Sequence, residues 1–69
     1  MSYQDELMKD WSVEKRVQVL EIVARQYFLL AISSPEELIK FAETNQDAFD
    51  LFVAMEMDRV VKKYGTNKM

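Results

Sequence analysis

The chain has 69 residues, of which 49% are hydrophobic and 30% are charged, with a formal net charge of −3. It contains no Cys and no His, which excludes a disulfide framework and removes the commonest zinc ligands. A chain of this length forms one domain. At this size a single hydrophobic core gives the fold only marginal stability. The apolar content exceeds what so small an interior can hold, so we expect self-association or a stable partner.

The N-terminal sequence MSYQDELMKD has neither the basic region nor the apolar region of a secretory signal. The longest unbroken apolar run covers residues 27–32, far short of the ~20 residues that span a bilayer. We therefore expect a cytoplasmic protein without a membrane partner.

A short first helix is predicted after Ser2, which has the residue type of an N-cap. A break near residues 10–12 would let the apolar edge of this helix fold back onto the core. Ser12 is then the expected N-cap of the following helix. The apolar edge consists of Leu7, Met8 and Trp11.

Residues 13–32 contain no Gly or Pro and are predicted to form the central helix of a bundle. A stripe with alternating spacings of four and three keeps its side chains on one face of the helix: Val13, Val17, Leu20, Ala24, Tyr27 and Ala31. Val19, Val23 and Leu30 widen this apolar face on one side, and Phe28 widens it on the other. The opposite arc is polar and should face water: Glu14, Gln18, Glu21 and Arg25.

The sequence Ser33-Ser34-Pro35-Glu36-Glu37 marks a helix boundary. Pro35 disfavours helical geometry at Ser34, so the central helix should end just before it. Ser34 at the N-cap, Pro35 at the first position and Glu37 at the third predict a capped helix over about 35–43. A turn at Thr44–Asp47 would follow, with Thr44 or Asn45 as the next cap.

The last helix is predicted over about 46–64, ended by Gly65. Its main apolar stripe consists of Phe49, Val53, Met57, Val60 and Tyr64. A second apolar edge in its first half consists of Ala48, Leu51, Phe52 and Met55. The residues expected to be mostly buried are Leu20, Ala24, Tyr27, Phe41, Phe49, Phe52 and Val53.

These patterns predict an all-α fold. We expect a small bundle of three main helices, over about 13–32, 35–43 and 46–64, with a short N-terminal helix. We expect residues 1–69 to form a single helical domain, with residues 66–69 as a frayed tail.

The side chains that most enzymes use are scarce. His and Cys are absent, every Ser lies near a predicted helix start, and the single Gly ends a helix. Glu56 and Asp58 point about 160° apart on a helix and cannot share a site. We therefore predict no catalytic residue, no cofactor site and no metal site.

Nucleic-acid binding is the first alternative, because the two helices around Thr44–Asp47 superficially match a helix-turn-helix. The early turns of the second helix carry Asp47 and Asp50, which would repel phosphates. The basic cluster of Arg59, Lys62 and Lys63 is more typical of a complement to the helix dipole. Residues 33–58 carry a local net charge of −6, which fits a solvated acidic face better than a nucleic-acid mimic.

Ile22 and Leu29 lie in line on the side of the central helix away from its main stripe. Aligned apolar residues of this kind predict a contact surface. The candidate protein-interaction residues are Ile22, Leu29, Leu51, Met55 and Trp11. The predicted function is a non-enzymatic protein-interaction module, a homodimeric adaptor or an inhibitor of a larger protein. A DNA-binding regulator and a structural subunit of a larger assembly remain the alternatives.

Overall fold

The computed structural model describes residues 2–65 as four helices and no strand, which confirms the all-α prediction. Helix α1 spans Tyr3–Met8, α2 spans Val13–Ile32, α3 spans Pro35–Thr44 and α4 spans Gln46–Tyr64. The tail predicted over residues 66–69 lies outside the described residues.

The first three helices begin at serine caps, as the sequence predicts. The hydroxyl of Ser2 accepts from the backbone N–H of the third residue beyond it at 3.0 Å, and the hydroxyl of Ser12 does so at 3.1 Å. Ser34 forms the full capping box, because its hydroxyl accepts from the Glu37 N–H while the Glu37 carboxylate accepts from the Ser34 N–H at 3.0 Å. These local bonds fix where each helix starts.

Helix α4 begins without a side-chain cap. Asn45 occupies the N-cap position at φ −140° and ψ 65°, but its side chain makes no capping hydrogen bond. Its amide donates instead to Thr44 Oγ1 at 3.2 Å, and its backbone N–H donates to the Phe41 carbonyl at 2.8 Å. Asn45 is therefore a one-residue connection that holds α3 and α4 close together. At the other end, Gly65 has φ 72°, a conformation that favours glycine.

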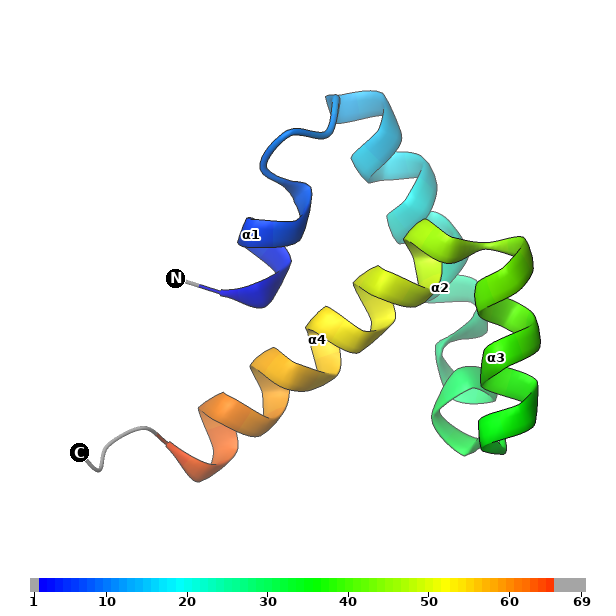
Figure 1. Cartoon of the computed structure of the whole chain (residues 1–69). Helices are drawn as coiled ribbons and strands as arrows, with labels where there is room; N and C mark the ends of the chain where they lie inside the picture. Colours follow the sequence, from blue (N-terminus) through cyan, green and yellow to red (C-terminus); the bar gives the residue numbers. More distant parts are fainter. Residues whose placement is uncertain (1, 66–69) are drawn as a thin grey trace.

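Helix α4 is the helix on which α1, α2 and α3 each pack (Figure 1). The sequence predicted this central role for α2, and the structure gives it to α4. The α1–α2 turn and the short α3–α4 connection place α1 and α3 on either side of α4, so α4 has the most neighbours. Its C-terminal half extends away from α2 and α3 (Figure 1).

The core is small because the molecule is thin. Along its shortest principal axis the molecule measures 17 Å, which leaves room for about two layers of helices. Val23 and Leu51 are the largest side chains that are completely enclosed. The buried residues are Val19, Val23, Leu30, Ala48, Leu51, Phe52 and Ala54. Within residues 2–65, no helix combines the length and the apolarity needed to cross a membrane.

The predicted buried stripe of α2 is wrong by about one residue of rotation. Val13 is 74% exposed and Leu20 is 40% exposed, whereas the residues one position before Leu20 and Ala24 are buried. The buried residues of α2 are Val19, Val23 and Leu30. One residue corresponds to about 100° around a helix, and α4 packs against this neighbouring edge. The polar arc from Glu14 to Arg25 is exposed, as predicted.

The same displacement occurs in α4. The predicted main stripe is exposed from Val53 onward, and the predicted second edge forms the core instead. Ala48 and Ala54 lie on the buried side, where their small side chains let neighbouring helices approach closely. Of the seven residues predicted to be mostly buried, Phe52 is buried, Tyr27, Phe41 and Phe49 are half-buried, and Leu20, Ala24 and Val53 are exposed.

Candidate functional site

The structure does not bring the five candidate interaction residues onto one exposed surface. Leu29 is 62% exposed, but Leu51 is 0% exposed and belongs to the core. Ile22, Met55 and Trp11 are half-buried and pack against that core. Leu51 must therefore be removed from the candidate surface, because the edge of α4 that carries it faces the interior.

Trp11 has a structural role in the turn between α1 and α2. The Lys15 ammonium lies 4.5 Å from the centre of the Trp11 ring, a cation–π arrangement. The same ammonium is 3.1 Å from the carboxylate of Asp47 at the start of α4. Trp11 and Lys15 thus join the turn to α4.

A continuous apolar surface does run along the outer face of α2. We call it the α2 stripe; it consists of Val13, Val17, Leu20, Ala24, Tyr27 and Ala31. Every member except the half-buried Tyr27 is exposed, and Phe28 beside the stripe is 82% exposed. The stripe extends over ~27 Å, at 1.5 Å of rise per residue. The sequence marks these residues as an apolar face, and within residues 2–65 the edge of α2 that is buried is the neighbouring one.

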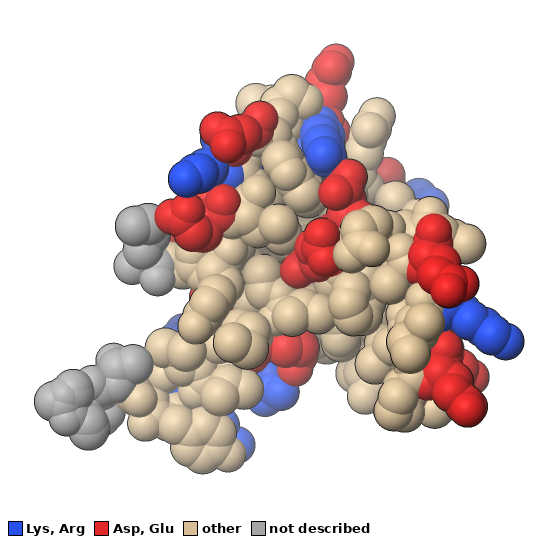
Figure 2. All heavy atoms as spheres, viewed as in Figure 1, with Lys and Arg blue, Asp and Glu red and all other residues tan. Residues whose placement is uncertain are grey.

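A second apolar surface lies on α4. We call it the α4 stripe; it consists of Val53, Met57, Val60 and Tyr64, which are 40–71% exposed. Figure 2 shows few charged side chains on this part of α4, whereas acidic side chains gather over α3. A cleft of about 420 Å³ lies where α1 packs on α4, next to part of the stripe, and is lined mainly by apolar side chains, among them Leu7, Phe49 and Met57.

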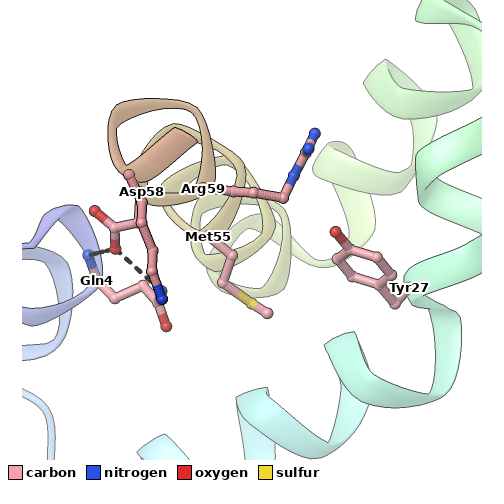
Figure 3. A pocket seen from close by; sticks show the side chains of 6 residues that line it. Gln4, Tyr27, Met55, Asp58 and Arg59 are labelled. Carbon is pink, nitrogen blue, oxygen red and sulfur yellow. Dashed lines mark hydrogen bonds between the residues drawn. The ribbon is translucent and has the colours of Figure 1, made fainter. Parts of the chain in front are cut away.

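A hollow of about 490 Å³ lies between α1, α2 and α4. Figure 3 shows that Met55 lies between two groups: Gln4 and Asp58 on one side, and Tyr27 and Arg59 on the other. Sequence reasoning missed this hollow, because its residues come from three helices and share no motif.

On the side of Tyr27 and Arg59, both side chains bond to Glu56. The Tyr27 hydroxyl donates to the Glu56 carboxylate, which also accepts from Arg59 Nη2 at 2.7 Å. The hydrogen bond from Tyr27, followed by that from Arg59, lowers the pKa of Glu56. The same bond to Glu56 raises the pKa of Tyr27. Glu56 therefore stays ionised and Tyr27 stays protonated, which fixes α2 to α4 and leaves neither group poised as an acid or base at neutral pH.

Asp58 holds α1 against α4. Its carboxylate accepts from the backbone N–H of Tyr3 at 2.7 Å and from that of Gln4 at 3.1 Å. The Gln4 side-chain amide adds a third bond at 3.0 Å. Desolvation acts to raise the pKa of Asp58, but the combined hydrogen bonds prevail and lower it. Asp58 thus acts as a cap supplied by another helix, satisfying donors at the start of α1.

No family model, curated protein or solved structure matches this chain. In the part of the chain that the structure describes, no group of three acidic side chains is arranged to hold a metal ion. The exposed apolar surfaces of the described residues are the α2 stripe and the α4 stripe.

Proposed function

We propose that this chain is a non-enzymatic protein-interaction module, a homodimer that acts as an adaptor or as an inhibitor of a larger protein. One observation carries the proposal. Among residues 2–65, seven hydrophobic residues are buried, whereas thirteen large hydrophobic residues are exposed. A protein that works alone in water gains little from this distribution, because burial of apolar surface is the main force that stabilises a fold.

The arrangement of the exposed residues supports binding rather than chance exposure. Scattered apolar side chains are common on protein surfaces, but aligned ones form patches that mark contact sites. The α2 stripe and the α4 stripe each follow one helix face at the spacing of a packing surface. Two separate stripes give the chain two surfaces, one for its own copy and one for another protein.

The polar chemistry is consistent with a binding role. Tyr27, Glu56 and Arg59 bond to one another, and Asp58 is engaged with the start of α1. These side chains hold helices together, so their polarity is explained without a reaction.

Helix α4 offers little to a DNA duplex. At its start, Gln46 donates to the Asp50 carboxylate at 2.8 Å, and Asp47 pairs with Lys15. A recognition helix needs free donors in these turns, and phosphates are repelled by its acids. A titration with duplex DNA at low and moderate salt separates the two functions: the interaction module gives no steeply salt-dependent binding, whereas a DNA-binding regulator does.

Co-purification from the organism that encodes the chain tests the proposal. The tagged protein is compared with the variant Met57→Ser/Val60→Ser, which makes the α4 stripe polar. The matched control is Lys40→Ser/Glu43→Ser, which changes two exposed polar positions on α3. We expect a protein that is recovered with the unchanged chain and the control but lost with the stripe variant. Recovery of no protein in this pattern would contradict a role for the α4 stripe in binding a partner.

A further inference from the structure

We propose that the α2 stripe is covered by the α2 helix of a second copy of this chain, in an antiparallel two-fold pair. This rests on the proposed interaction function and names the partner of one of its two surfaces. Four features support it: the repeat of the stripe, the sizes of its side chains, the position of α4, and the charges at the stripe edge.

The repeat of the stripe matches that of helices that pair lengthwise. Its spacings alternate between four and three from Val13 to Ala31, so each seven-residue period contributes two side chains. This is the narrow seam that two helices share, and it leaves the flanking positions free for other contacts. In α2, one flank is the edge that packs on α4.

Side-chain size selects the antiparallel direction. One position of the repeat holds the bulkier residues Val13, Leu20 and Tyr27. The other position holds Val17, Ala24 and Ala31. A parallel pair would stack alanine on alanine and tyrosine on tyrosine, which alternates voids with crowding and conflicts with close packing.

An antiparallel pair brings the two positions of the repeat opposite each other. A single register, centred midway between Leu20 and Ala24, satisfies every pairing along the stripe. In this register Leu20 faces Ala24 of the second copy, Val13 faces Ala31, and Val17 faces Tyr27. Each layer then combines a larger side chain with a smaller one, as close packing requires.

The position of α4 leaves room for this partner helix. The α2 stripe lies about 100° around the helix from the edge that packs on α4, so a second helix can lie alongside without displacing α4. Tyr27 lies at the border, where its ring meets the Phe52 ring edge-on at 5.6 Å between centres. Two copies paired in this way place two α2 and two α4 helices together, in the manner of a four-helix bundle.

Charge does not oppose the pairing. Glu21 and Arg25 lie on the polar flank of the stripe, where they form an ion pair at 3.2 Å with both side chains exposed. In the proposed register the two pairs come together at the middle of the interface, with two carboxylates balanced by two guanidinium groups. Each Arg25 can then bond to Glu21 of either copy, which compensates for the approach of like charges.

Disulfide trapping tests both the partner and its direction. The chain contains no Cys, so introduced thiols react without background. The variants Val13→Cys and Ala31→Cys change exposed positions, and circular dichroism checks that each keeps the helicity of the unchanged chain. One variant carries a tag, and each is oxidised mildly at micromolar concentration, alone and as an equal mixture.

The antiparallel register brings residue 13 of one copy against residue 31 of the other and holds like positions ~27 Å apart. We therefore expect the mixture to form a tagged–untagged disulfide dimer at least ~10-fold faster than either variant alone, since disulfides require Cα atoms within about 7 Å. Fast cross-linking of Val13→Cys alone would overturn the antiparallel direction, and absence of cross-links in every sample would overturn pairing through this stripe.

Failure of this inference is distinguishable from failure of the proposed function. A monomer that still captures another protein, and loses it on Leu20→Asp, would refute the second copy as the occupant and the homodimer with it, while the role as adaptor or inhibitor stands. A mixture that cross-links as expected, in a chain that captures no other protein, would support the pairing and contradict a role as adaptor or inhibitor.

Discussion

Helix α2 has two apolar edges that differ in what covers them. One edge, formed by Val19, Val23 and Leu30, is buried under the rest of the chain. The other, the α2 stripe, is exposed along almost its whole length. The edges carry the same kinds of side chain and lie about one residue apart around the helix. The comparison teaches that periodicity identifies an apolar arc, whereas tertiary contacts decide which part of it the chain covers for itself.

The largest expected effect comes from comparing the same Leu→Ala substitution at a covered position in the core and at an exposed position on the α2 stripe. Leu51→Ala should lower the free energy of unfolding by about 2–5 kcal/mol, because Leu51 is completely enclosed and its truncation leaves a cavity. Leu20→Ala should cost less than about 1 kcal/mol in the dilute monomer, because Leu20 is already 40% exposed. Urea unfolding of both variants measures the difference. Equal losses would show that Leu20 on the α2 stripe is packed as closely as Leu51 in the core, and would contradict the exposure of the stripe.

A smaller loss of stability is expected at the start of α3, where a helix cap acts independently of both edges of α2. Ser34→Ala should cost about 1 kcal/mol, since it removes the side-chain acceptor of the capping box that starts α3. Pro35→Ala is the neighbouring control and should change the unfolding free energy little, because Pro35 makes no such bond. The same urea titrations measure both variants. A Ser34→Ala variant as stable as the unchanged chain would contradict a stabilising role for the Ser34 cap.

The smallest effect is local and concerns α1. Asp58→Asn should speed hydrogen exchange at the Tyr3 and Gln4 amides and lower the urea midpoint only slightly, because it weakens the acceptor that holds α1. Asp10→Asn, at an exposed position in the following turn, is the control. Exchange at Tyr3 and Gln4 that is equally fast in both variants would contradict the role of Asp58.

The same contact predicts a pH dependence. The folded-state pKa of Asp58 is lowered from its ordinary value of 3.8. A carboxyl with a lowered pKa stabilises the fold above the unfolded-state pKa, and this contribution is lost as the pH falls through the folded-state value. Docking of α1 should therefore persist at pH 5 and weaken only below 3.8. Exchange at Tyr3 and Gln4, followed from pH 6 downward, measures it, and loss of protection above pH 5 would contradict the assignment.

The helix boundaries could be predicted because their causes are local. Ser2, Ser12 and Ser34 each cap a helix through a residue three positions away, and Pro35 sets the end of α2 within the same few residues. Asn45 shows the limit of such signals. Its residue type predicts a capping side chain, but the amide bonds to Thr44 instead.

The rotation of the helices could not be predicted, because it depends on contacts between distant residues. The Tyr27–Glu56 bond joins residues 29 positions apart, and the bond from Tyr3 to Asp58 joins residues 55 apart. Neither pair forms a motif. The candidate surface failed at Leu51 for the same reason, since only the packing of α4 shows that this edge faces the core.

Sedimentation velocity across the micromolar range tests most directly whether the α2 stripe is an interface. The unchanged chain should sediment as a dimer. Leu20→Asp should weaken association about 10-fold or more, because a carboxylate would enter an apolar contact and 1.4 kcal/mol corresponds to a tenfold change. Gln18→Asp, at an exposed position on the polar arc, adds the same charge and should leave the dimer intact. A monomer at every concentration, or equal dissociation of both variants, would contradict the account.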